Sequence, residues 1–298
     1  MKEYLTTNKT NYYLGIYVDI LGQGEKLARM NKMPVNEEED KVFTSILHET
    51  LGSVIEVQTL FDDFFESFQK IGDDTENLLK SLSKENQKIF LDARKTNVKD
   101  IRFSDTIIIY FSLDKESCIN PMGSVFAALA AAAATFAMSL SCKIPLRGAI
   151  NIGTGTEIKK SGLYGQLLHS LHHIESKVAD YPRIIIGEEL IEMIQTYDND
   201  PNIENDILRN IDKAFIPRIK QMIKIDHDGH AILHYLQEEF AGLPGVRTYD
   251  MYGKIKKYID SELIKYQDNK ILTHRYKKLK KYVRSNQFAW KIDNTNIV

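Results

Sequence analysis

The sequence predicts an α/β (α+β) fold with a ferredoxin-like βαββαβ core, to which further strands and C-terminal helices are added. Residues 12–21, 101–111 and 144–153 are rich in β-branched and other apolar side chains, as expected for strands. Residues 40–70 carry apolar side chains at helical spacing, and residues 125–140 form a second apolar helical stretch. Because "IRFSDTIIIYF" has two strand-like runs, the order becomes β-α-β-β-α-β.

The composition and charge of the chain are those of a soluble globular protein. The chain has 298 residues, which suits one large domain or a domain with additions, and its 43% hydrophobic and 27% charged residues are ordinary for a soluble protein. A net charge of −2 predicts no overall attraction to nucleic acid or to an anionic membrane. Cys118 and Cys142 fit no metal-binding spacing, and the N-terminus lacks the apolar centre of a signal peptide, so we expect a cytoplasmic protein.

The first half of the chain supplies the predicted core. Residues 12–21 are apolar on nearly both faces, which indicates a central strand, and "GQGEKLARM" is a turn that enters a helix. The acidic run "NEEED" suits the N-terminus of the helix at 40–70. Residues 74–98 are polar and predict a helical insertion. The alanine-rich helix at 125–140 begins after "NP" and is short for a bilayer span, so we expect it to be buried against the sheet, with no membrane span.

The second half adds smaller elements to this core. We expect a short strand at 158–164, a helix at 165–178 and a strand "RIIIG" that leads into the helix "EELIEMI". "MIKIDHDGHAILHYL" predicts a hairpin with "HDGH" at its turn, because Asp-Gly is a strong two-residue turn signal. Residues 247–284 predict one or two lysine-rich helices. The expected organisation is a core of residues 1–200 and an extension of residues 201–298 packed on it.

Two aspartates occupy matching places in this topology. Asp19 ends the first strand, and Asp105 stands at the start of the third. The first and third strands of a βαββαβ sheet are antiparallel neighbours, so the two carboxylates should meet. Such a pair suits two Mg²⁺ or Mn²⁺ ions and a phosphate substrate, and the backbone N–H groups of "ILGQGEK" could cradle phosphate oxygens. The alternative is that both are turn residues at strand ends.

Four segments, "YVDILG", "FSDTIII", "LRGAINIG" and "YGQLLHSLHHIESKVADYPRIII", resemble the motifs of class III nucleotidyl cyclases. The resemblance covers roughly residues 12–190 and is closer to the bacterial pyrimidine cyclases of Pycsar anti-phage defence. It implies a palm domain that converts UTP, or alternatively CTP, to a 3′,5′-cyclic monophosphate. It also implies a homodimer with sites at the subunit interface, and a separate effector that senses the product.

The resemblance also assigns roles to residues. It implies that Asp19 and Asp105 bind the metal ions through their side chains and that Ile20 binds through its backbone. The substrate-binding residues that it implies follow directly in the chain: Ile20, Leu21, Gly22 and Gln23.

The sequence departs from the purine-using members of that family. Where those enzymes carry Asn and Arg, four and eight residues after Gly165, this chain has His169 and His173. The position that would recognise adenine is Gly162, which favours a pyrimidine. The transition-state arginine is then unassigned, and Arg102 and Arg147 are the candidates, because guanidinium is always charged.

Several interpretations stay open at this stage. His169 and His173 share a helix face, so they could contact substrate or a second subunit, bind zinc, or have an ordinary surface role. Arg183 could cap the helix before it or pair with Glu175. The rivals to a cyclase are a non-catalytic palm that binds nucleotide and regulates a partner, and a palm enzyme that makes dinucleotides. The chain lacks the "GGDEF"-like loop expected of the latter.

Overall fold

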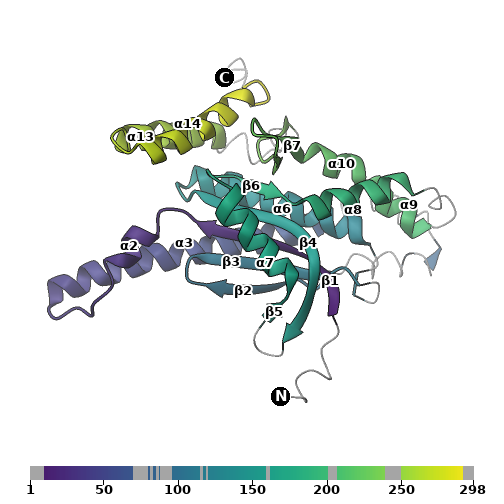
Figure 1. The fold of residues 1–298 in the computed structure, drawn as a ribbon, viewed down its shortest axis with the longest axis horizontal. Helices are drawn as coiled ribbons and strands as arrows, with labels where there is room; N and C mark the ends of the chain where they lie inside the picture. Colours follow the sequence, from purple (N-terminus) through teal and green to yellow (C-terminus); the bar gives the residue numbers. More distant parts are fainter. Residues whose placement is uncertain are drawn as a thin grey trace.

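The computed structural model describes residues 10–69, 80, 83–84, 87, 96–114, 117–118, 120–158, 162–200, 207–238 and 250–290. These residues form a mixed α/β fold around one eight-stranded mixed sheet (Figure 1). The helix expected at 74–98 falls largely outside the described residues.

The strand order places the first strand in the interior of the sheet. Hydrogen-bonded neighbours run in the order β2-β3-β1-β4-β6-β8-β7, and β5 pairs with β4. Only β4 and β6 pair in parallel among the described strands. The strands are β1 Thr10–Ile20, β2 Lys99–Phe103, β3 Thr106–Ser112, β4 Leu146–Ile158, β5 Gly162–Tyr164, β6 Ile184–Ile186, β7 Ile223–Ile225 and β8 Ala231–Leu233.

Helices cover both faces of this sheet. Figure 1 shows α3 and α6 behind the sheet and α7 in front of it. The described helices are α2 Gly24–Ala28, α3 Glu37–Gln69, α6 Pro121–Ser141, α7 Gln166–His173, the π-helical turn η1 Ile174–Val178, α8 Glu188–Asn199, α9 Ile207–Ala214, α10 Ile216–Gln221, α13 Met251–Lys265 and α14 Lys270–Ser285.

Strand β1 is buried on both faces, as its sequence predicts. Leu14 and Ile16 point toward α3 and α6 and belong to the main core. Tyr13 belongs to a smaller cluster beneath α7. Gly15 lets α7 approach closely, since a Cβ there would lie 2.6 Å from Leu171 Cδ1. Side chains of successive residues alternate between these faces, and this alternation decides which residues can share a site.

The alanine-rich helix α6 is the centre of the main core. It is long and apolar enough to cross a membrane, but 78% of its apolar window is buried inside the protein. The side chain of Asn120 caps its start by accepting a hydrogen bond from the N–H of Gly123. The carboxylate of Asp212, from α9, accepts a second bond from the same N–H. The buried helix that the sequence predicts is therefore present.

The C-terminal region shares this core and sheet. Strand β8 pairs with β6, and Ile255 and Leu279 belong to the main core. The "HDGH" segment forms the turn of the β7–β8 hairpin, as predicted, and Gly229 adopts φ +86° there. The expected C-terminal helices are α13 and α14.

Three details differ from the sequence predictions. The strand expected at 158–164 is the end of β4 followed by the separate three-residue strand β5. The helix expected at 165–178 changes to a π-helical turn after His173. Helices α9 and α10 were not predicted.

Candidate functional site

Asp19 and Asp105 lie together at one end of the sheet. Asp19 pairs in register with Thr106, the residue after Asp105. The backbone N–H of Ile20 donates to the carbonyl of Asp105 at 3.1 Å, which fixes the β2–β3 turn beside the end of β1. The neighbouring antiparallel strands that the sequence predicts therefore bring the two aspartates together.

The electrostatic environment of Asp19 reflects this convergence. Burial raises its pKa to about 6, and the charges of Asp105 and Glu175 add to the rise. The Arg147 charge and a hydrogen bond from Thr106 Oγ1, 3.4 Å from Asp19 Oδ1, act in the opposite direction. The carboxylates of Asp105 and Glu175 are thus both close enough to Asp19 to oppose its ionisation.

Arg147 is the cation at this cluster. It faces Asp19 across the β1–β4 pairing, and its Nη2 lies 3.6 Å from Asp19 Oδ2. Its Nε donates to Glu175 Oε1 at 2.6 Å. Glu175 is buried in η1, and it was considered from the sequence only as a partner of Arg183. Glu175 follows the buried Leu171 by four residues, so the two share a helix face. This spacing in the sequence could have indicated that Glu175 points inward.

Arg102, the other arginine candidate, does not reach this cluster. It pairs in register with Ile107, which pairs with Val18, whereas Asp19 pairs with Thr106. Because successive strand residues point to opposite faces, Arg102 lies on the face that bears α3 and α6. Its Nε donates instead to Asp100 Oδ2 at 2.8 Å on the exposed edge strand. Of the two arginines, only Arg147 is placed beside Asp19.

The turn from β1 into α2 holds the residues expected near a triphosphate. Ile20 is buried, and the N–H of Leu21 donates to the carbonyl of Pro145 at 2.9 Å. Gly22 adopts φ +84° and has open space around it. The Gln23 side chain is buried and its Nε2 lies 3.4 Å from the carbonyl of Thr50 on α3. Gln23 therefore contacts α3 in this conformation.

His169 and His173 are exposed on the outer face of α7. They lie away from Leu167 and Leu171, the buried residues of the same helix. The neighbouring His172 is the one that reaches the sheet, with Nδ1 3.4 Å from the hydroxyl of Tyr17, two residues before Asp19. Among the described residues, no hydrogen bond or ion pair joins His169 or His173 to the carboxylate cluster.

Gly162 has a structural reason to be glycine. It adopts φ +89°, and a Cβ there would lie 2.6 Å from Ile101 Cδ1. The position that the resemblance links to adenine recognition is therefore one where the backbone conformation and the contact with Ile101 both favour glycine.

A second acidic group lies at the β7–β8 turn. Asp226, His227 and Asp228 are the described residues whose ligand atoms lie close enough to hold an ion together. Both carboxylates already pair with buried Arg183, with Arg183 Nη2 2.6 Å from Asp228 Oδ2. Arg183 Nη2 also donates to the carbonyl of Val178, at the end of η1. Arg183 therefore caps the helix, as considered, but it pairs with this turn and not with Glu175.

The donor set at Asp19 and Asp105 fits Mg²⁺ or Mn²⁺. Both ions prefer oxygen ligands, and carboxylates that repel one another are stabilised by a divalent cation between them. Burial is the main cause of the raised pKa of Asp19, and the nearby charges of Asp105 and Glu175 add to it. The backbone carbonyl of Ile20 is a third oxygen at the same strand end.

A scan against protein-family models found no match for this chain, and a search of curated proteins found none either.

Proposed function

We propose that this protein is a nucleotidyl cyclase, a phosphorus–oxygen lyase. It would convert a pyrimidine nucleoside triphosphate, UTP before CTP, to the 3′,5′-cyclic monophosphate and pyrophosphate. The observation that carries the proposal is the convergence of Asp19, Asp105 and Arg147 at the end of the central strand. The cyclic product would act as a second messenger in bacterial anti-phage defence, sensed by a separate effector.

The strand order supports a palm fold of the class III cyclase type. The first four long strands follow one another in space as β2-β3-β1-β4, all antiparallel. With α2 and α3 after β1 and α6 after β3, this order matches a βαββαβ unit and supports the ferredoxin-like core that we propose. The β6, β8 and β7 strands and the C-terminal helices are then additions to that core.

The proposed reaction is an attack of the ribose 3′-oxygen on the α-phosphorus of the same nucleotide, which breaks the bond to pyrophosphate. Asp19, Asp105 and the Ile20 carbonyl would hold two Mg²⁺ or Mn²⁺ ions. When bound, these ions supply activation of the hydroxyl and neutralisation of phosphate charge. Arg147 stabilises negative charge that develops on the phosphate, and Glu175 holds the guanidinium in place. Alignment of the two reacting atoms supplies much of the remaining rate gain.

The proposed base preference rests on Gly162 and on the resemblance to pyrimidine cyclases. A glycine offers no side chain to accept a hydrogen bond from adenine, so discrimination in favour of ATP should be weak. The proposed homodimer and cytoplasmic location likewise rest on the sequence.

The alternative is a catalytically degenerate cyclase-like domain that binds nucleotide and regulates a partner. Two observations favour it: His169 and His173 stand where Asn and Arg are expected, and Arg147 is bound to Glu175 and Asp19. In a degenerate domain this ion-pair network would be purely structural.

The experiment is incubation of the purified protein with each of the four nucleoside triphosphates and Mn²⁺, followed by product identification by mass. We expect cyclic UMP or cyclic CMP with pyrophosphate. Nucleotide binding without any product would favour the degenerate domain, and a linear or cyclic dinucleotide would favour the other palm chemistry. If ATP or GTP gave the highest kcat/KM, this result would contradict only the proposed preference for a pyrimidine base, not the cyclase chemistry.

A further inference from the structure

The C-terminal helix pair, which we define as α13 and α14, is strongly basic although the chain as a whole is not. Residues 251–285 contain eleven Lys or Arg and three Asp or Glu, a formal charge of +8, whereas the whole chain carries −2. Helix α14 alone has seven Lys or Arg and no Asp or Glu. A basic stripe along one helix is typical of proteins that bind polyanions, and the global charge conceals it here.

The cations of α14 divide into two sets by their contacts. The first set ties the helix to its own molecule: Lys278 Nζ lies 2.7 Å from Asp180 Oδ2, and Lys280 Nζ lies 2.6 Å from Asp260 Oδ1. The second set is exposed and consists of Lys270, Lys277, Lys281 and Arg284. Within the part of the chain that the structure describes, none of these four pairs with a carboxylate. They are therefore available to a partner.

The four exposed cations form one row on the outward face of α14. Their intervals of seven, four and three residues keep them on one side of an α-helix. The row extends over about 21 Å at a rise of about 1.5 Å per residue. His274 is also exposed and lies in the same row, four residues after Lys270. Such a row is long enough to follow several consecutive phosphates of a nucleic-acid strand.

An exposed aromatic side chain stands beyond the C-terminal end of this row. Phe288 follows Arg284 by four residues and is 80% exposed. Proteins that bind single strands without sequence preference combine a basic track for the backbone with aromatic side chains on which bases stack. Because the bases of a duplex are already stacked on one another, Phe288 favours a single strand as the partner.

An anionic membrane is a poorer match for this surface. A helix that lies on a membrane inserts an apolar face, but the apolar side chains of α14 are already buried in the protein: Tyr276, Leu279, Tyr282 and Val283. Helix α3 carries nine Asp or Glu and one Lys, so a broad anionic surface would also meet repulsion. A narrow polyanion can follow α14 alone.

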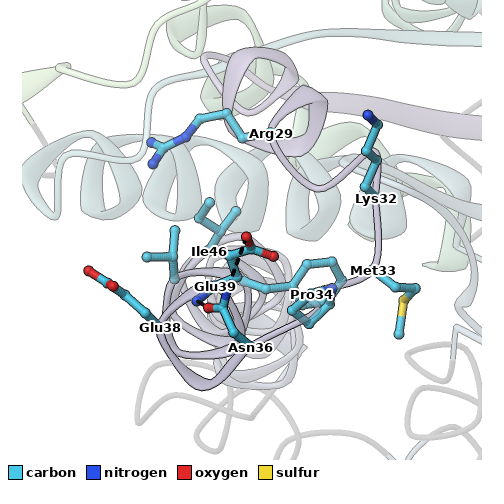
Figure 2. A pocket seen from close by; sticks show the side chains of 10 residues that line it. Arg29, Lys32, Met33, Pro34, Asn36, Glu38, Glu39 and Ile46 are labelled. Carbon is cyan, nitrogen blue, oxygen red and sulfur yellow. Dashed lines mark hydrogen bonds between the residues drawn. The ribbon is translucent and has the colours of Figure 1, made fainter.

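A second group of exposed cations lies in a mixed-charge setting. Arg29 and Lys32 line an open pocket of about 440 Å³ between α2 and α3, and Glu38 and Glu39 line it from the α3 side (Figure 2). The two signs of charge are balanced there, so this pocket does not form a rival basic surface. Its two cations therefore supply a matched control.

We propose that the outward face of α14 binds single-stranded nucleic acid without sequence preference. Backbone phosphates pair with the four outward cations, and a base stacks on Phe288. Because binding releases the counter-ions of those phosphates, the affinity falls as the salt concentration rises. DNA and RNA share this chemistry, and the test separates them.

The test is fluorescence anisotropy of the purified full chain with labelled probes of about 20 nucleotides. The probes are single-stranded DNA, single-stranded RNA of the same sequence and the DNA duplex. The site variants are Lys277→Gln with Lys281→Gln, and Phe288→Ala. The control is Arg29→Gln with Lys32→Gln, which removes the same charge from exposed positions. Circular dichroism checks that each variant is folded.

We expect the wild type and the control to bind a single strand equally, and the relative Kd of DNA and RNA shows which is preferred. The double lysine variant should raise this Kd by about tenfold or more at low salt, and the slope of log K against log salt should become shallower by about two, one for each lost phosphate contact. Phe288→Ala should weaken single-strand binding by about fivefold or more and leave duplex binding unchanged.

Three results with these probes would overturn the proposal: no binding of either single strand, an equal loss in the control, or a duplex that binds as tightly as the single strands. Unlabelled polyglutamate and phosphatidylserine vesicles serve as competitors. If either displaced the single strand as well as unlabelled single strand does, charge alone or a membrane would explain the surface, and the proposal would be wrong. The readout is binding, so the inference is independent of the proposed catalytic function.

Discussion

Replacement of Arg183 by methionine should destabilise the protein strongly and in a pH-dependent manner. Arg183 is 1% exposed, and its guanidinium bonds to Asp226, Asp228 and the carbonyl of Val178. Removing one member of a buried ion pair leaves an uncompensated charge and costs about 3–5 kcal/mol. That is a large part of the roughly 5–15 kcal/mol by which folded domains are stable.

The pH dependence follows from the carboxylates of the turn. Burial alone would raise the pKa of Asp226, but hydrogen bonds from Tyr181, His227 and Arg183 outweigh it, so the pKa lies below the ordinary value. A lowered folded-state pKa stabilises the fold above the ordinary Asp pKa of about 3.9, and this stabilisation is lost as the pH falls further. In Arg183→Met the carboxylate can take up a proton more readily. The loss of stability should therefore be greatest near pH 7 and smaller near pH 3, below the ordinary Asp pKa.

The assay is urea unfolding of wild type and Arg183→Met at pH 7 and pH 3. The matched control is Lys220→Met, which removes an exposed ion pair with Asp198 and should cost less than about 1 kcal/mol. A cost below about 1 kcal/mol for Arg183→Met, equal at both pH values, would refute the electrostatic reasoning.

Three further predictions concern other parts of the fold. Arg147→Ala should lower any nucleotide turnover by about 100-fold, whereas Arg102→Ala on the opposite sheet face should leave it within about twofold, both measured as kcat. Burial raises the pKa of Asp212 to about 7 despite two backbone hydrogen bonds. The contribution of this carboxyl to the free energy of unfolding is therefore present at low pH and is lost as the pH rises through 7. In urea unfolding, Asp212→Asn should gain stability relative to wild type between about pH 5 and pH 8. Gly148→Ala should cost about 1–3 kcal/mol in the same assay, because its Cβ would lie 2.2 Å from the Tyr17 carbonyl, and an unchanged stability would contradict that close contact.

The core of the fold could be predicted because its signals are local and consistent. The apolar run before Asp19, the hairpin around Asp105 and the alanine-rich α6 each have a pattern that matches one kind of element. Their order then restricts the topology to few choices, and the antiparallel pairing of β1 with β3 follows.

The less local features could not be predicted in the same way. Whether Arg102 or Arg147 lies beside Asp19 depends on strand register, since a shift of one residue exchanges the faces. The pairing of Arg183 joins residues 45 positions apart, and no pattern in the sequence links them. The Asp212 contact with the start of α6 spans 90 residues and likewise depends on packing.

The most direct test of the central claim is the Mn²⁺-dependent turnover of UTP by wild type, Asp19→Ala and Asp105→Ala, with Asp100→Ala as the matched control. Asp100 is an exposed carboxylate on β2, and it pairs with Arg102 on the other face of the sheet. If the carboxylate pair holds the metal ions, both site variants keep the fold, as judged by circular dichroism, and lose cyclic UMP formation by at least about 100-fold. The control should retain nearly full turnover. Wild-type turnover in either Asp19→Ala or Asp105→Ala would contradict the account.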